Sequence, residues 1–376
     1  GEVHASWSGW IPTINITDLK LLTQDGQSNL VRFDYAVVEI SPLRSLTNLN
    51  LHPRLLIVGG MQIVLERDLN GQFSVAGMPP SRWPVAQWLS QQQNFTLRDA
   101  RISFTDRMRD SIPAHFSDVT LAIAEKNSGQ HISGRFRRDD RPQEQYAFSL
   151  RASGDILSSS WGGDLSVQIQ RALAAPTLTL LGWADSGITG GEFDATVRSH
   201  WEGAKLRNAT LSIDASSLHS GGEGSRTIES LSAQAIAQRV PAGWSVEIER
   251  LRLGTDDLTT PATGAVRWRN RAGQPRLLAF RANNVDITEL SALLPATLAL
   301  PIITTQSKDG IMARGKLENV LGGLKYDDGK VSNYYVEAAV RDLTINDSTF
   351  TSGVSGFDLR VSANDEGGVV DATQNH

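Results

Sequence analysis

Histidine is the residue type of this chain that could most readily hold a metal or move a proton near neutral pH. The seven histidines stand at positions 4, 52, 115, 131, 200, 219 and 376. No two are four residues apart, and none lies in a His-Glu-x-x-His motif, so the helical pattern of a metalloprotease site is missing. The sequence therefore predicts no metal site, and a centre assembled from distant strands is the minor alternative.

Paired carboxylates could act as the acid and base of a glycosidase. The adjacent pair Asp139 and Asp140 lies among Arg137, Arg138 and Arg141. Neighbouring residues of a strand point to opposite faces, and a mixed cluster of this kind neutralises itself in solvent. We interpret these residues as a solvated charge cluster.

Other catalytic signatures are also missing from the sequence. There is no Gly-x-Ser-x-Gly elbow, and the glycine-rich stretch at 221–224 lacks the lysine of a phosphate-binding loop. The absence of cysteine excludes thiol nucleophiles, disulfides and cysteine metal sites. The sequence predicts no catalytic residue and no cofactor, and we expect a protein that is not an enzyme.

The charge balance argues against nucleic acid as a partner. Lys and Arg total 36 and Asp and Glu total 41, which gives a formal net charge of -5. A nucleic-acid-binding protein needs a basic footprint, and none is present. No apolar run reaches the roughly 18–20 residues of a membrane span. Because the chain opens on Gly1 and runs directly into strand-like sequence, we expect a piece of a longer protein.

Period-two alternation of apolar residues dominates the chain, and it places alternate side chains on one face of a β-strand. Such strands are apolar on one side and polar on the other, which favours an antiparallel sheet. Clear examples are 31–37, 61–65, 119–123, 146–152, 165–169, 211–213, 246–248 and 354–361, the last with a slip between Val354 and Phe357.

Turns and helices complete the expected pattern. Tight turns are predicted at Asn70-Gly71, 127–129, 271–273 and 327–329, which makes a meander of hairpins the natural arrangement. Helical patterns are short and few, near residues 84–93, 170–175 and 286–299. No stretch has the composition of a long linker, so we expect one continuous β segment over 1–376.

The nine tryptophans recur near predicted strand ends and turns. Large amphipathic rings of this kind close the ends of cores, and packing is the commoner reason for them. Anchoring at a membrane interface is the alternative.

Several segments resemble one known family. Trp7-Ser8-Gly9-Trp10-Ile11-Pro12 with the strand after it resembles the Trp-x-Gly-x-x-Pro segment of YhdP-type members of the AsmA-like superfamily. The likeness continues through Ser41-Pro42-Leu43-Arg44-Ser45-Leu46 and the strand pair over 55–77. Gly190-Gly191-Glu192-Phe193 with Trp201, and the Leu-Leu-Pro helix at 286–295 with Leu300-Pro301 and Gly310, extend it over nearly the whole chain.

This resemblance implies a periplasmic protein, anchored to the inner membrane in its full-length form by a helix outside this chain. It implies a mainly β fold whose long curved antiparallel sheet forms an elongated apolar groove, with a few short helices. Phospholipid acyl chains would lie in the groove and pass between the inner and outer membranes. The partners implied are phospholipid and the two membranes, and we expect a monomer.

The lining of such a groove is predicted from strand parity. We expect the lipid-binding residues to include Phe33, Tyr35, Ile63, Leu65, Leu121, Ile123, Phe148 and Leu150. An apolar trough would hold a lipid tail because each buried methylene contributes roughly 0.8 kcal/mol.

Two alternatives to the groove stay open. The same alternation would build a closed β-sandwich, an extracytoplasmic binding or structural module, and pattern alone favours it. A β-rich carbohydrate-active enzyme would need a cleft with convergent carboxylates, which no spacing supports.

Overall fold

A computed structural model describes residues 1–22, 29–48, 53–69, 73–75, 94–108, 113–126, 129–156, 158–181, 188–220, 227–254, 261–270, 275–287, 311–327, 330–347 and 354–374. It divides into two compact units, the first made of residues 1–171 and 198–206 and the second of 172–197 and 207–376. The expectation of one continuous segment stays a prediction.

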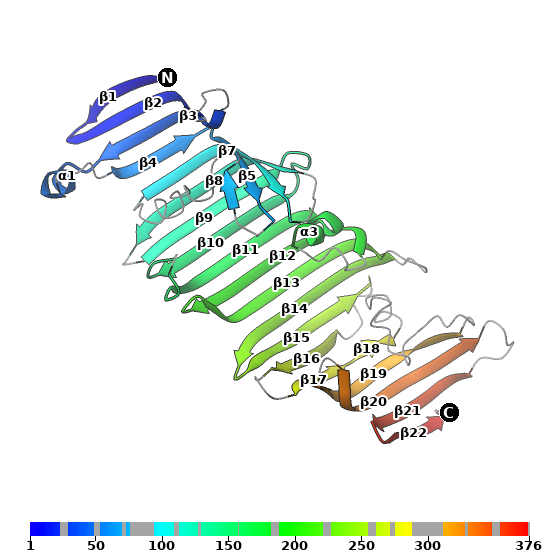
Figure 1. Ribbon diagram of the computed structural model, residues 1–376. Coiled ribbons are helices and arrows are strands. Elements are labelled where there is room, and N and C mark those ends of the chain that lie inside the picture. The colour runs from blue at the N-terminus through cyan, green and yellow to red at the C-terminus, as the bar shows by residue number, and fades with distance from the viewer. Residues whose placement is uncertain are drawn as a thin grey trace. The chain divides into compact units, whose positions relative to one another are not determined.

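The first unit contains eleven of the described strands and one short helix, coloured from blue to green in Figure 1. They are β1 (Glu2–Ser8), β2 (Ile11–Leu22), β3 (Asn29–Ile40), α1 (Pro42–Asn48), β4 (Pro53–Gly59), β5 (Gln62–Arg67), β6 (Phe73–Val75), β7 (Asn94–Asp106), β8 (Ala114–Lys126), β9 (Gly129–Arg138), β10 (Gln145–Ser153) and β11 (Gly162–Leu173).

The second unit holds most of the remaining elements. They are α3 (Ala174–Leu181), β12 (Ile188–Glu202), β13 (Lys205–Ser220), β14 (Thr227–Val240), β15 (Gly243–Leu253), β16 (Ala262–Arg269), β17 (Arg276–Asn283), β18 (Val285–Asp286), β19 (Ile311–Asp327), β20 (Lys330–Asp347), β21 (Val354–Asn364) and β22 (Gly367–Gln374). The end of β12 and the first residues of β13 belong to the first unit.

The described strands form a 22-stranded sheet that is mainly antiparallel. This confirms the expected fold class of a mainly β protein with few helices. The strands on both sides of the four expected turns pair as hairpins: β5 with β6, β8 with β9, β16 with β17 and β19 with β20. Among the described pairings, β7 is the exception, because it runs parallel to both β4 and β5.

The helices differ in part from expectation. A helix does follow the strand near residue 170, but it begins at Ala174 because β11 continues to Leu173. The helix α1 was not predicted, although Pro42 suits a first helical position directly after Ser41. The expected helices at 84–93 and 286–299 lie outside the described residues, apart from Asp286 and Ile287.

The core of the first unit lies against one face of its sheet. Seven buried side chains form one cluster: Ala36, Val58, Phe95, Leu97, Ala100, Val119 and Ile123. Partly buried apolar residues, Phe33, Leu121 and Ile132 among them, pack against it. Burying this surface is the main contribution that favours folding of a half-apolar sheet.

Bulges keep the apolar side chains on that face where the alternation slips. Asp99 and Asp118 have positive φ of 51° and 48°, and the register shifts beside each of them. In β7 the apolar positions are therefore Phe95 and Leu97 before the bulge and Ala100 after it, yet all three join one cluster. The slip noted between Val354 and Phe357 is also a bulge, at Gly356 with φ of 75°.

Candidate apolar lipid-binding face

The candidate site of the first unit is a pair of apolar rows that cross its strands. Residues in register on paired strands point to the same face of the sheet. One row consists of Ala5, Ile14, Val38, Leu56, Phe95, Ile123, Ile132, Leu150 and Leu165. The second consists of Val3, Ile16, Ala36, Val58, Leu97, Leu121, Gly134, Phe148 and Val167. No member of either row is polar, and we call this the apolar face of the first unit.

Gly134 is required in its row because an aromatic ring lies over it. A Cβ atom built on Gly134 would lie 2.5 Å from the Phe148 ring and 3.0 Å from the Thr120 carbonyl oxygen. The ring of Phe148 therefore lies over Gly134 of β9 and fills the row at a position where β9 has no side chain.

The second unit has a row of the same kind. It consists of Ala209, Ala237, Val246, Val266, Phe280, Gly322, Val336, Ala363 and Gly368, in register from β13 to β22. The Phe280 ring lies over Gly322, as Phe148 lies over Gly134. Val246, Val266 and Phe280 are half-buried.

Four of the eight predicted lining residues lie in the two rows of the first unit. Leu121 and Phe148 share one row, and Ile123 and Leu150 share the other. Of these, Ile123 is buried in the core cluster, and the other three are half-buried.

The other four lining residues lie elsewhere on the sheet. Phe33 packs against the core cluster. Ile63 is in register with Val31 and Ile102, and Leu65 with Val75 and Phe104. Tyr35 is in register with Gly59, and this pair is adjacent to the core pair Ala36 and Val58. Because adjacent residues of a strand point to opposite faces, the Tyr35 side chain lies on the face opposite the core.

Sequence reasoning missed the row of the second unit. The signal was present, because Val246 and Ile248 alternate as clearly as the residues chosen in the first unit. What could not be read is that Gly322, Ala363 and Gly368 belong to the same row, since small residues give no alternation.

The opposite face of the first unit has two hollows, of which the larger is mainly polar. Two adjoining hollows of about 540 and 380 Å³ share Thr120, Arg135 and Ala147 in their linings. Apolar residues, Leu97, Leu121 and Ala122 among them, also line the smaller hollow. The larger is also lined by Asp99, Asp118, Phe136, Arg137, Gln145, Tyr146, Gln168 and Gln170, most of them charged or amide side chains. A lining of charged and amide groups does not suit acyl chains, because those groups would lose water without gaining partners.

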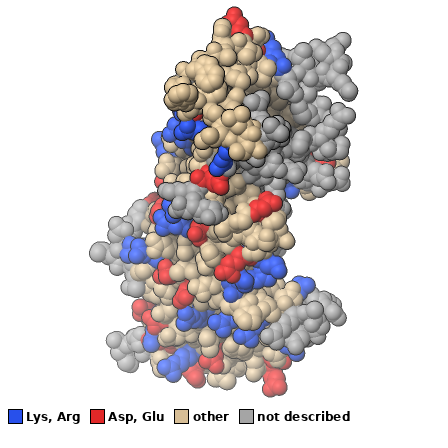
Figure 2. All heavy atoms as spheres, turned by 90° about the vertical axis from the view of Figure 1, so that its left-hand side faces the viewer, with Lys and Arg blue, Asp and Glu red and all other residues tan. Residues whose placement is uncertain are grey.

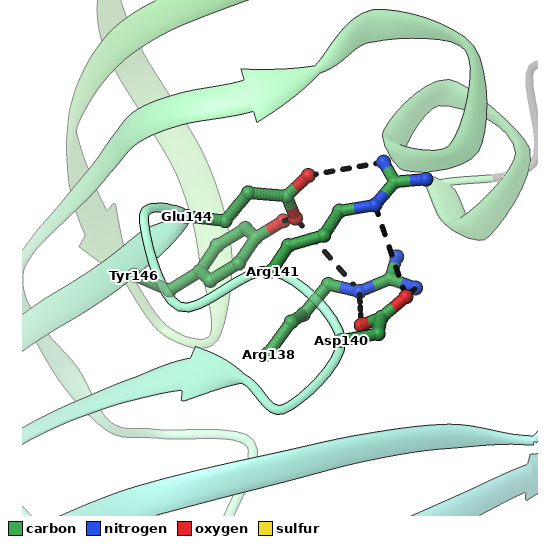
Figure 3. A network of polar contacts seen from close by, with 5 residues as sticks. All are labelled: Arg138, Asp140, Arg141, Glu144 and Tyr146. Atoms are coloured by element: carbon green, nitrogen blue, oxygen red, sulfur yellow. Dashed lines mark hydrogen bonds and ion pairs between the residues drawn. The ribbon is translucent and has the colours of Figure 1, made fainter.

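The charge cluster predicted around Asp140 closes the β9–β10 hairpin (Figure 3). Asp140 accepts hydrogen bonds from Arg138 at 2.8 and 3.0 Å, which lowers the pKa of Asp140 and raises that of Arg138. Glu144, which sequence reasoning missed, is fully buried between Arg138 and Arg141 at 3.8 and 3.3 Å. The Tyr146 hydroxyl donates to Glu144 at 3.1 Å.

This network balances two guanidinium groups with two carboxylates. The ring of Tyr146 stacks on Phe136 with centroids 5.0 Å apart, and Phe136 meets Phe116 edge-on at 5.3 Å. The network therefore anchors an aromatic stack beside the apolar face. Because its charges neutralise each other, we assign the network a structural role.

Two absences concern metal sites and membrane spans. Within the ranges that the structure describes, no three histidine or acidic side chains are arranged to hold a metal ion. In the same ranges, no helix has the length and hydropathy to cross a membrane.

Comparison with known proteins gives one finding. The family described as "YhdP protein" matches residues 1–375. Searches of curated proteins and of solved structures found no match. The chain therefore belongs to the YhdP family, and this membership indicates a protein of lipid transport in the cell envelope.

Proposed function

We propose that the apolar faces of the two units bind phospholipid acyl chains, and that the full-length protein carries phospholipid between the inner and outer membranes. The observation that supports this proposal is the register of the apolar rows, which join nine strands in each unit without a polar side chain. In this proposal the parent protein lies in the periplasm, is anchored to the inner membrane and works as a monomer. No catalytic role is part of it.

The physical reason is the partial exposure of these rows. A sheet whose apolar face were sealed by protein would bury all of it, whereas Phe148, Val266 and Phe280 keep part of their surface accessible. Each methylene of an acyl chain that covers such a surface contributes about 0.8 kcal/mol. A row of apolar side chains can therefore bind acyl chains of different lengths, at any point along the row, without polar contacts.

The alternative is a structural or binding module with a sealed core, and one observation favours it locally. The seven side chains of the core cluster are at most 8 % exposed. In this part of the first unit, the apolar face serves as an ordinary core. The lipid-binding part of the proposal therefore rests on the half-buried members of the rows, and Leu121, Phe148 and Leu150 are the predicted lining residues among them.

Charge substitutions separate the two functions. Phe148→Asp and Val266→Asp place a carboxylate in a row, and Ser149→Asp and Ala265→Asp place one at the adjacent position on the opposite face. If the rows bind acyl chains, the two row variants lose most of the phospholipid that co-purifies with the chain, and they still unfold cooperatively. The two controls retain the lipid.

A sealed core gives a different result. There the row variants would bury an unpaired charge at a cost of several kcal/mol, comparable with the whole stability of a domain. Insoluble or non-cooperative row variants beside normal controls would therefore support the structural module and contradict lipid binding. The readouts are thermal melts and mass spectrometry of extracted lipid.

A further inference from the structure

Four large apolar side chains at one end of the first unit are mostly exposed to solvent. Trp10 is 91 % exposed, Leu43 79 %, Leu46 74 % and Trp7 73 %. Single exposed apolar residues are ordinary on protein surfaces, but a group of four that includes two tryptophans marks an interaction surface.

The chain path brings the four residues to the same end of the sheet. Trp7 is in register with Pro12, and Trp10 lies in the turn between β1 and β2. Thr13 pairs with Glu39 near the end of β3, and α1, which carries Leu43 and Leu46, starts two residues after Ile40. Figure 1 shows the β1–β2 turn and α1 at the same, left-hand end of these strands. We call these four residues the tryptophan corner.

The corner continues the apolar face. Val3, Ala5 and Trp7 alternate along β1, and Val3 and Ala5 are the β1 members of the two rows. In α1, Leu43 and Leu46 are three residues apart, which places them on one side of the helix. The corner therefore adjoins the β1 members of the two rows.

The charges around the corner favour an anionic lipid surface. Arg44 in α1 and Arg54 at the start of β4 are exposed at this end, whereas the acidic Glu39 is half-buried. Figure 2 faces this end of the strands, and its upper part, where β1 to β4 lie, is mostly uncharged, with a few basic and a few acidic residues. Indole rings favour the boundary between headgroups and acyl chains, and nearby arginines are attracted to anionic headgroups.

We propose that the tryptophan corner docks directly on the surface of a phospholipid bilayer, with Trp7, Trp10, Leu43 and Leu46 inserted at the interface. This contact is separate from any membrane anchor and from acyl-chain binding along the rows. It would bring the β1 members of the apolar rows close to the bilayer from which lipid leaves or which it enters.

The test is flotation of the purified chain with vesicles of phosphatidylethanolamine and phosphatidylglycerol in a 3:1 ratio. We expect the wild-type chain to bind, and the double variants W7S/W10S and L43S/L46S each to lose at least about tenfold in affinity. Trp268 in the second unit is 40 % exposed, and W268S is the matched control that should bind as wild type does. Circular dichroism melts verify that the variants fold.

A second measurement locates the contact. Because the chain has no cysteine, Leu46→Cys can carry a single environment-sensitive fluorophore. Its emission should rise and shift to the blue on adding vesicles. A label at Val369→Cys, a position in β22 that is 61 % exposed, should not change.

Several results would overturn the proposal. They are equal vesicle binding by wild type and both double variants, no binding by the wild type, or an unchanged label at position 46. Self-association in ultracentrifugation that disappears in W7S/W10S would assign the corner to a second copy of the chain instead. Loss of co-purifying lipid in Phe148→Asp with normal flotation would leave docking intact, so the two proposals fail separately.

Discussion

Glu144 is the fully buried carboxylate of the described part of the chain, and its partners determine its effect on stability. Arg138 and Arg141 are 13 % and 28 % exposed, so solvent replaces a lost partner only in part. We expect Glu144→Gln to lower the free energy of unfolding by about 2 kcal/mol, somewhat less than for a pair buried on both sides.

The matched control for Glu144 is Glu247→Gln. Glu247 pairs with Arg281 at 3.1 Å, but both side chains are more than half exposed. Its loss should change stability by no more than about 0.5 kcal/mol. If the two substitutions changed the free energy of unfolding in urea by the same amount, the buried Glu144 network would stabilise the fold no more than an exposed ion pair does.

His200 is expected to titrate above its ordinary range. Its Nδ1 lies 2.8 Å from an Asp164 carboxylate oxygen and its Nε2 3.5 Å from Glu202, and the hydrogen bond to Asp164 is the main reason for the raised pKa. Because the folded pKa exceeds the unfolded value of about 6.5, the contribution to stability is complete below that pH. It is lost as the pH rises through the folded pKa.

Ring chemical shifts measured by NMR between pH 5 and 9 test this assignment. Asp164→Asn should lower the His200 pKa, and Asp371→Asn, in β22, should leave it unchanged. A pKa of His200 that is the same in wild type and Asp164→Asn would contradict the hydrogen bond.

At the scale of the strands, single residues in the left-handed (αL) conformation form the bulges, and these bulges determine which face the following side chains take. Asp99 has φ of 51°, a conformation that costs an ordinary L residue about 1–2 kcal/mol and a β-branched residue more. Asp99→Val should therefore destabilise the chain by about 1–2 kcal/mol, whereas Asp99→Gly should be neutral or slightly stabilising.

Urea unfolding of the two Asp99 variants measures this difference. Ser103→Val, in the same strand without positive φ, controls for the change of side chain. If valine at position 99 were tolerated as well as glycine, the bulge would not depend on a residue that accepts positive φ.

The same bulges explain what could be predicted of the strands. Alternation predicted β8 and β10 with Leu121, Ile123, Phe148 and Leu150 on one face, because these stretches contain no bulge. It failed to place Tyr35, because Phe33 and Ala36 both contribute to the core although they differ in parity and no bulge separates them. In the sequence, a bulge is visible only as a break in the apolar alternation. The pairing with the neighbouring strand determines which face the side chains after the bulge take.

For the whole molecule, sequence predicted the mainly antiparallel sheet but missed one nonlocal strand pairing and one buried carboxylate. The parallel pairing of β7 with β4 and β5 joins residues about 40 positions apart, and no local signal encodes it. The burial of Glu144 could not be predicted either, because a carboxylate beside arginines in the sequence suggests a solvated group. In the structure, the hairpin and the Tyr146 ring enclose it.

The claim that acyl chains lie on the apolar rows is tested most directly by site-specific photo-crosslinking in cells that express the full-length protein. The photoreactive residue is placed at Phe148 and Val266 in the rows, and at Ser149 and Arg267, their neighbours on the opposite face. The account predicts phospholipid adducts at Phe148 and Val266 and none at Ser149 and Arg267. Adducts of equal yield on both faces, or adducts to protein alone at the row positions, would contradict it.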